Sequence, residues 1–305
     1  MTENQKQQKP LREFDYSLIA KKIDGLHFNI NRSLEREIAN AIANGHVQHE
    51  RSLSVLLVML RFAWNSYEAV RYLSADTPPD PARKANYTIV LPAIDRQLLD
   101  LFFSLVYMLD DLIPRSLDYQ KAGWRDCVEE RDERKAQYDG RDEWADFLKS
   151  MDSQIDTMVD RFKLTPEEQQ NPKLVDYWKT PFKLAKRKGP CQSFLQFLEK
   201  ELYKDISAQA HLTFAGLIKV SGFLVADLLG DQVPETNRVR AMQSFHFQQV
   251  SRTVIIYLAV ATEIDTYLKL HNQTTIDYLW VILSEFVVEA KEMYEIRYQD
   301  RKRYE

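Results

Sequence analysis

The sequence predicts an all-α protein that folds as a single large helical bundle, and three features of its composition indicate this class. The chain has 305 residues, of which 45% are hydrophobic, so it can fill a sizeable core. Only 8 residues are glycine, while 28% are charged. Glycine weakens helix interiors, whereas lysine, arginine and glutamate are tolerated on exposed helical faces. We expect about seven to nine helices in one domain over residues 15–305, after a disordered arm over residues 1–14.

The first two helices are predicted from apolar periodicity and from the residues that end them. Asp15–Ala43 has the pattern of an amphipathic helix, and Asn44 and Gly45 behind it form a favoured stop. Ser52–Leu73 is strongly apolar and predicts a second helix. The prolines in Ser74–Tyr87 predict a loop, because proline removes a backbone donor and clashes with the preceding helical turn.

The segment Ile94–Ile113 predicts a central helix with one polar stripe. At 100° per residue, five polar residues fall within an arc of about 80°: Arg96, Asp100, Ser104, Tyr107 and Asp111. Apolar residues cover most of the remaining circumference, which is the opposite of a surface helix. We therefore expect this helix inside the bundle, with Arg96 and Asp100 paired four residues apart on its stripe.

A densely charged segment, Arg115–Thr165, predicts a protruding helical hairpin with its tip at Asp139 and Gly140. Charges of both signs alternate along it, as is typical of solvated helices. We expect some of its aromatic residues to be exposed and to offer a docking surface for a protein partner: Trp124, Tyr138 and Trp144.

The second half of the chain predicts a turn-rich link, Thr165–Lys188, followed by three long helices. The first of these, Ser193–Leu229, carries a second polar stripe, since three polar residues recur every four positions: Tyr203, Ser207 and His211. The other two are Glu235–Leu270 and Thr275–Arg301.

We expect the two polar stripes to face each other. A buried guanidinium costs several kcal/mol unless it is neutralised and hydrogen-bonded. Arg96 therefore needs Asp100 and a further acceptor, such as Ser207 or Tyr203, from the second helix.

The stretches AIDRQLLDLFFSLVYMLDD and YKDISAQAHLTFAGL resemble the bacterial family known as domain of unknown function 5677. Its members carry an arginine with an acidic residue four positions later on one apolar helix, and Tyr-x-x-x-Ser-x-x-x-His on another. The matching residues here are Arg96, Asp100, Tyr203, Ser207 and His211. The resemblance covers Leu53 to Leu270, although the family more often has Glu where Asp100 stands. The family has no established activity, so the resemblance implies only a fold and the location of a site.

A histidine close to an arginine and a carboxylate can act as a general base while the guanidinium holds a phosphate. On this reading Arg96, Asp100 and His211 are catalytic, and Tyr203 and Ser207 bind the substrate, a nucleotide or RNA, in bacterial stress or phage defence. The alternative is an internal polar network that fixes the register of the helices, in a non-enzymatic interaction or assembly module. No cofactor and no metal are expected.

Two further patterns offer alternative nucleic-acid chemistries. Arg240 and His246 have the spacing of helical ribonucleases of the HEPN type, but chance alone yields about one such spacing in a chain of this composition. Ala241 also stands where that motif usually has a polar residue. The basic run Lys183–Gly189 is either the complement of a helix dipole or a loop that contacts phosphate.

Overall charge and cysteine usage indicate the setting of the protein. The net charge of −4 and the pI of about 6.0 argue against a dedicated nucleic-acid binder but allow local basic patches. Cys127 and Cys191 are too few for a disulfide framework, and the polar start of the chain lacks the apolar segment of a secretory signal. We expect a cytoplasmic protein without membrane spans, and the sequence leaves its oligomeric state open.

Overall fold

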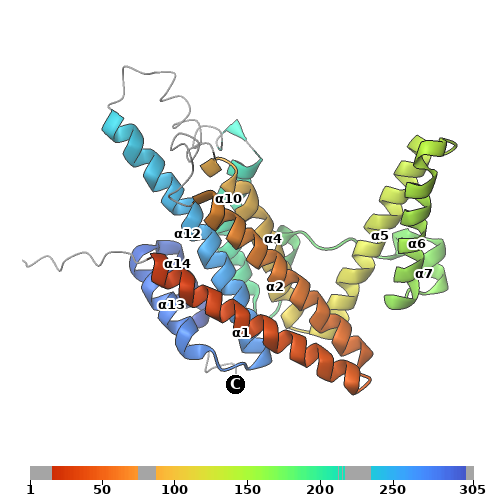
Figure 1. Ribbon diagram of the computed structural model, residues 1–305, viewed down its shortest axis with the longest axis horizontal. Helices are drawn as coiled ribbons and strands as arrows, with labels where there is room; N and C mark the ends of the chain where they lie inside the picture. Colours follow the sequence, from red (N-terminus) through yellow and green to blue (C-terminus); the bar gives the residue numbers. More distant parts are fainter. Residues whose placement is uncertain (1–15, 75–86, 212, 215, 217–234, 300–305) are drawn as a thin grey trace, which may run out of the picture.

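The computed structural model describes residues 16–74, 87–211, 213, 214, 216 and 235–299. All regular secondary structure within these ranges is helical and none is strand, which confirms the predicted all-α class (Figure 1). The helices form one bundle from which a long helical hairpin projects. The arm predicted over residues 1–14 and most of the loop predicted after residue 74 lie outside the described residues.

Two helices of 28 residues form the N-terminal hairpin of the bundle, α1 (Tyr16–Ala43) and α2 (Val47–Ser74). They pack along each other and join through a short turn. Gly45 in that turn has a φ of 68°, a left-handed conformation that glycine adopts at little cost. The predicted helix stop at Asn44 and Gly45 is thus confirmed.

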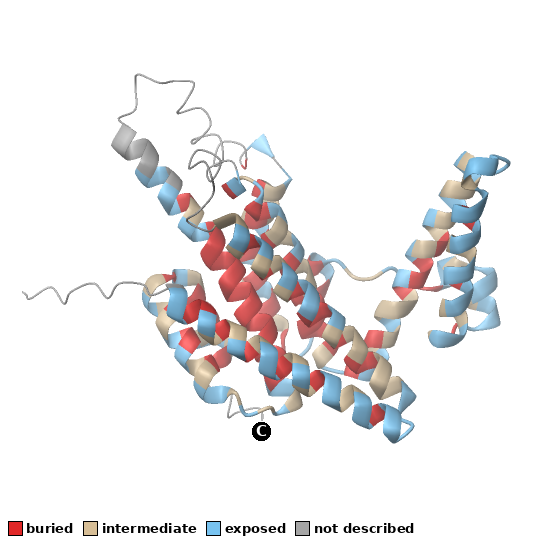
Figure 2. Cartoon of the chain, in the orientation of Figure 1, coloured by how far each residue is buried: buried red, intermediate tan, exposed pale blue. Residues whose placement is uncertain are grey.

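The centre of the bundle is formed by α4 (Leu91–Leu109) and α12 (Glu235–Leu268), which pack against each other and against α2. Figure 2 shows buried residues concentrated on these central helices. Every residue of α12 from 249 to 265 is buried, as expected of a helix surrounded on all sides. α4 itself has buried residues along its whole length, from Leu91 to Met108, so the prediction that the striped apolar helix lies inside the bundle is confirmed.

The predicted end of that striped helix at Ile113 is wrong, because α4 stops at Leu109. Asp111 has φ −156° and ψ 78°, which breaks the helix, and α5 (Leu112–Tyr138) begins directly after it. Pro114 accounts for the break. It has no N–H to continue the hydrogen bonding of α4, but it fits the first turn of α5, where no such donor is needed.

The projecting hairpin consists of α5, the 3-10 helix η1 (Asp142–Trp144), α6 (Ala145–Arg161) and α7 (Pro166–Gln170) (Figure 1). Gly140 turns the chain at the predicted tip with a φ of 76°. The hairpin thus has the position and the turn that its charge pattern and its glycine predict.

The hairpin has a small apolar core of its own, formed by Trp124, Val128, Ile155, Leu164 and Val175. The prediction that Trp124 is exposed is therefore wrong, because its side chain is 2% exposed in this core. Tyr138 and Trp144 are half-buried near the tip, where their rings stack with centroids 4.1 Å apart. The alternation of charges gave no sign that one aromatic residue would nucleate a second core.

The link between the hairpin and the bundle contains two short elements, η2 (Pro172–Leu174) and α8 (Pro181–Ala185). After them come α9 (Gln192–Phe197), the π-helix η3 (Leu198–Tyr203) and α10 (Lys204–Ala210). α8 contacts both α4 and η3, and α10 packs along α4.

The single helix predicted over Ser193–Leu229 is wrong in its described part, because α10 ends at Ala210. The backbone N–H and the hydroxyl of Thr213 both donate to the carbonyl of Ala208, so the chain folds back on itself. A Cβ on Gly216 would lie 2.0 Å from the same carbonyl oxygen, so only glycine fits this turn. The remainder of the predicted helix lies outside the described residues.

The C-terminal helix predicted over Thr275–Arg301 is also interrupted. It consists of α13 (Gln273–Phe286), α14 (Val288–Met293) and the π-helix η4 (Tyr294–Tyr298). Val287, in extended conformation with φ −128° and ψ 117°, separates the first two. Over the ranges that the structure covers, no helix combines the length and the apolar character needed to traverse a bilayer.

Candidate functional site

The structure brings Arg96 of α4 into contact with Tyr203 at the end of η3. The guanidinium carbon lies 3.9 Å from the centroid of the Tyr203 ring, and Nη2 donates to the Tyr203 hydroxyl. Nη1 forms an ion pair with Oδ2 of Asp100, one turn along α4, without meeting hydrogen-bond geometry. Two stripes predicted from different helices therefore meet, with Tyr203 rather than Ser207 as the acceptor from the second helix.

Aromatic packing holds the Tyr203 ring in place. Phe103 of α4 and Phe182 of α8 both contact it edge-on, with ring centroids at 5.7 and 5.0 Å. Such edge-to-face pairs add about 0.5–1.5 kcal/mol beyond the area they bury. The guanidinium of Arg96 thus lies on a ring that two neighbouring helices fix in position.

Burial perturbs the acidic groups of this cluster. It raises the pKa of Asp100, although the guanidinium of Arg96 opposes the rise and His211 opposes it to a smaller extent. Burial and the Asp100 carboxylate both raise the pKa of the Tyr203 hydroxyl. The side chain of Arg96 is 16% exposed and that of Asp100 is 42% exposed, so the cluster reaches the surface at the Asp100 end.

Ser207 and His211 continue the stripe of Tyr203 along α10. Ser207 is half-buried, and its carbonyl accepts the backbone N–H of His211, which caps the helix. His211 is exposed and lies close enough to Asp100 to affect its pKa. Among the described residues, no hydrogen bond joins either side chain to Arg96 or Asp100, so three of the five predicted residues are in direct contact.

A second, buried polar network lies beside the cluster, and it was not predicted from the sequence. Asp95 of α4 accepts a hydrogen bond from the hydroxyl of Thr253, and burial raises its pKa to about 7. Arg252 of α12 donates to Asp205 at 2.8 Å and lies 3.6 Å from Glu289 of α14. A charged residue inside an apolar run, as at Asp95 and Arg252, was the signal that could have revealed it.

This network ties four helices together and is closed to solvent at Asp95 and Arg252, whereas the side chains of Asp205 and Glu289 are 22% and 24% exposed. Gln209 of α10 donates to Asp205 and accepts from Gln249 of α12, at 2.9 and 3.2 Å. Asp95 is fully buried and Arg252 is 4% exposed. Oδ2 of Asp95 and Nε and Nη1 of Arg252 are buried without a hydrogen-bond partner. The network fixes the relative positions of α4, α10, α12 and α14.

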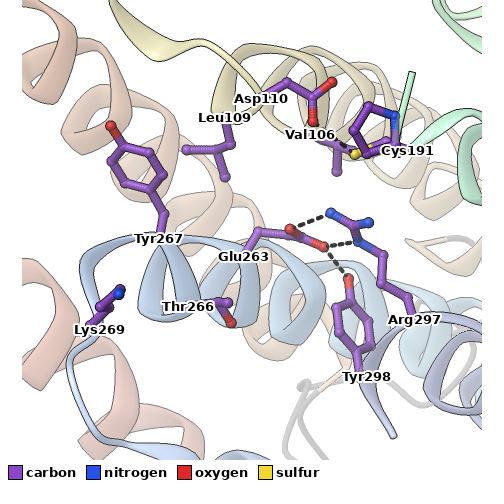
Figure 3. Close-up of a pocket in the computed structure, with 11 residues that line it drawn as sticks. Val106, Leu109, Asp110, Cys191, Glu263, Thr266, Tyr267, Lys269, Arg297 and Tyr298 are labelled. Carbon is purple, nitrogen blue, oxygen red and sulfur yellow. Dashed lines mark hydrogen bonds and ion pairs between the residues drawn. The ribbon is translucent and has the colours of Figure 1, made fainter. Parts of the chain in front are cut away.

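A cavity of about 320 Å³ opens at the other end of α4 (Figure 3). Its floor carries an ion pair: Glu263 accepts Nε and Nη2 of Arg297 at 2.5 and 2.9 Å, and the hydroxyl of Tyr298 at 3.0 Å. Val106 and Leu109 supply apolar wall. Glu263 and Arg297 neutralise each other in one bidentate pair, which favours a structural role for them over the binding of a charged ligand.

Cys191 lines the same cavity, and its surroundings disfavour the thiolate form. Its thiol donates to Oδ1 of Asp110 at 3.1 Å, and burial raises its pKa to about 12. Thiolates, not thiols, attack electrophiles and bind metals. Asp110 in turn accepts from Arg115 at 2.9 Å, so it connects the cavity with the start of α5.

The residues of the ribonuclease alternative are found on α12, in separate surroundings. His246 shares a hydrogen bond with the hydroxyl of Thr88 at 2.8 Å, whereas Arg240 is exposed. Six positions on a straight helix correspond to about 240° around its axis. Over the described ranges, no hydrogen bond or ion pair joins Arg240 to His246.

Comparison with protein-family models, with curated proteins and with solved structures finds no match to this chain.

Proposed function

We propose that the cluster of Arg96, Asp100 and Tyr203, extended by Ser207 and His211, binds a phosphate-bearing ligand, a nucleotide or RNA. The resemblance to domain of unknown function 5677 would make the protein bacterial, and its composition fits the cytoplasm. A part in stress or phage defence is the role we propose for it, by analogy with other helical bacterial proteins.

The observation that carries this proposal is that two neighbouring buried polar atoms of the cluster each lack a hydrogen-bond partner. Nε of Arg96, a donor, and Oδ1 of Asp100, an acceptor, have no hydrogen-bond partner. Leaving such a group unsatisfied costs about 1–3 kcal/mol, more if it is charged. Both atoms are covered in this arrangement, so a ligand reaches them when the Asp100 side chain, which is 42% exposed, moves aside. A ligand that presents both an anionic acceptor and a hydroxyl donor then satisfies both atoms, and a ribonucleotide carries these groups close together.

The surroundings of the cluster support an anionic ligand. Lys183 is exposed on α8, next to Phe182, which contacts the Tyr203 ring at 5.0 Å. The exposed imidazole of His211 is the side-chain type that most often serves as a general base. If the protein is an enzyme, His211 is the residue we expect to accept a proton, with Arg96 opposing charge on the phosphate.

The test is a binding titration with a 5′-fluorescein 12-residue RNA and, separately, with AMP, followed by gel analysis of the RNA for cleavage. We expect Arg96→Gln to weaken binding at least tenfold. Arg61→Gln is the matched control, because Arg61 is an exposed arginine of α2 paired with Glu35. Equal affinity in wild type and a folded Arg96→Gln variant would overturn the proposal.

A second candidate function is docking of a protein partner, or of another copy of this chain, through the hairpin. The tip supports it: Trp144 contacts both Tyr138 and Phe147, and Phe147 is 45% exposed. Aromatic residues of this kind are enriched at protein interfaces. Light scattering after size exclusion would show a lower mass for Phe147→Ser if self-association runs through the tip, and the same mass if it does not.

A further inference from the structure

Three cations from separate segments converge on the ring of Tyr107, at the far end of the α4 stripe. The guanidinium of Arg115 lies 4.3 Å from the ring centroid, that of Arg187 4.9 Å, and Nζ of Lys179 5.8 Å. Arg187 also donates to the Tyr107 hydroxyl. We call these four residues the Tyr107 cluster. Like charges this close repel one another unless an anion lies among them.

Acidic side chains compensate only part of this charge. Arg115 is paired with Asp110 at 2.9 Å. For Lys179 and Arg187, the described part of the chain provides no carboxylate within 4 Å. Burial lowers the pKa of Lys179, and Arg187 and Arg115 lower it further, whereas two more distant carboxylates oppose this: Asp118 and Asp176. Among the described residues, Lys179 and Arg187 therefore carry positive charge at the ring that no directly paired carboxylate neutralises, although Asp118 and Asp176 offset part of it.

The charged groups are accessible although the ring beneath them is buried. Tyr107 packs against Trp178 with ring centroids 5.6 Å apart. Arg187 is exposed, and Arg115 and Lys179 are half-buried. Of the three charges, that of Arg187 is therefore the most open to an anion arriving from solvent.

We infer that the Tyr107 cluster binds a phosphate group through Arg115, Lys179 and Arg187, and that the ligand of the protein is an RNA strand rather than a mononucleotide. This inference rests on the proposed function of the Arg96 cluster. Arginine suits such a site because its planar fork of donors matches the oxygens of a phosphate.

The spacing along α4 supports an extended ligand. Tyr107 follows Arg96 by 11 positions, which corresponds to about 16 Å along the helix and about 20° around it. Trp178 covers the stripe between them, since its indole N–H donates to Ser104 at 2.9 Å. The segment from Phe182, on the Tyr203 ring, to Arg187, on the Tyr107 ring, connects the two sites instead, and Lys183 and Lys186 are exposed on it. One phosphate cannot occupy both sites, and neither can two adjacent phosphates, but phosphates a few nucleotides apart on one strand can.

The experiment compares a 5′-fluorescein 12-residue RNA with AMP on the full chain. Lys179→Gln/Arg187→Gln is expected to weaken RNA binding at least tenfold and to reduce the slope of log K against log salt by about 0.7, the loss of one phosphate contact. AMP binding, which we assign to Arg96, stays unchanged. Arg134→Gln/Lys149→Gln removes two cations from the hairpin and serves as the control with unaltered RNA affinity.

Lys179→Gln alone keeps the test valid if the double variant folds poorly. Because Arg187 and Arg115 repel Lys179, removing its charge is expected to leave the Tm equal or higher while RNA binding falls.

Unchanged RNA affinity in both Lys179→Gln and the double variant overturns the second site, whatever the effect of Arg96→Gln. An equal loss of RNA and AMP binding overturns the assignment to RNA, since it marks a mononucleotide site. RNA binding that depends on Arg187 but not on Arg96 overturns the proposed function instead, and absence of binding by wild type overturns both.

Discussion

The guanidinium of Arg96 lies over the ring of Tyr203, 107 positions later in the chain, and donates to its hydroxyl. The two residues belong to α4 and η3, and each is the start of a polar stripe on a helix that is otherwise mostly apolar. Their contact brings the Asp100 carboxylate and the end of α10 to one place. The structure thereby gives the polar residues of both helices a common location.

Tyr203→Phe tests the contribution of the Tyr203 hydroxyl separately from that of its ring. The variant keeps the stacking surface for Arg96 but removes the acceptor of Nη2. Hydrogen bonds to charged groups contribute about 1.5–3 kcal/mol, so we expect the free energy of unfolding in urea to fall by about that amount. An unchanged midpoint and slope would show that the hydroxyl contributes nothing to the pair.

Asp95→Asn isolates the titration of a buried carboxyl. Burial raises the pKa of Asp95 to about 7, against about 3.9 in an unfolded chain. Between these pH values the folded state retains a proton that the unfolded state has lost, so rising pH reduces the free energy of unfolding. The free energy of unfolding of the wild type minus that of Asp95→Asn should therefore fall by up to about 4 kcal/mol between pH 4 and pH 7.

The comparison with the variant is necessary because His27 acts in the opposite direction. Burial lowers its pKa to about 4, so its contribution to stability rises with pH in the acid range. Both proteins contain His27, and subtraction cancels it. A difference between the two proteins that is constant from pH 4 to pH 7 would contradict the raised pKa of Asp95.

Glu263→Ala tests the ion pair on the cavity floor. Removing one partner leaves the Arg297 charge buried, and such changes cost about 3–5 kcal/mol. Glu35→Ala, at an exposed pair with Arg61, is expected to cost at most about 1 kcal/mol. Thermal and urea unfolding give both values. Recovery of stability in the double variant Glu263→Leu/Arg297→Leu would confirm that the unpaired charge causes the loss. Equal losses of stability in Glu263→Ala and Glu35→Ala would contradict this explanation.

The two cysteines are expected to react at very different rates. Cys191 is 5% exposed and its pKa is raised to about 12, whereas Cys127 is half-buried near the surface of the hairpin. A maleimide should therefore label the native protein at Cys127 and reach Cys191 only on unfolding. Peptide mass spectrometry checks this, and native labelling of Cys191 would contradict the described packing.

Alanine at two glycines should change stability in opposite directions. Gly25 lies inside α1, and a Cβ added there would meet no neighbouring atom within 4 Å, so Gly25→Ala should stabilise by about 0.5–1 kcal/mol. Gly216→Ala would press its Cβ against the carbonyl of Ala208 and must displace the turn after α10. Urea unfolding measures both, and a neutral Gly216→Ala would show that this turn is not fixed.

Composition and periodicity predicted the parts of the fold that depend on local sequence. The all-α class, the stop at Gly45 and the hairpin tip at Gly140 each follow from residue preferences that act within one turn. The interruptions at Asp111 and Val287 were missed, because an apolar pattern continues through both breaks. At Val287 tertiary packing decides the break, which a single sequence does not display, whereas Pro114 was a local sign of the break at Asp111.

The candidate site was predictable in part, for a similar reason. Spacing along two helices predicted that Arg96, Asp100 and Tyr203 would meet, since stripes on apolar helices need polar partners. The convergence of Lys179 and Arg187 on Tyr107 was not predictable, because it depends on how the link around α8 folds over α4. Long-range loop placement of this kind leaves no periodic pattern.

The central claim is that Nε–H of Arg96 donates a hydrogen bond to a phosphate oxygen of the ligand. NMR of the arginine Nε–H groups tests this claim most directly. The Arg96 signal is identified by its loss in Arg96→Lys, and AMP or the 12-residue RNA is then titrated into wild type. We predict a large, saturable shift of the Arg96 Nε–H signal, with the Arg61 signal unmoved. An Arg96 signal that stays in place while the ligand binds would contradict the account.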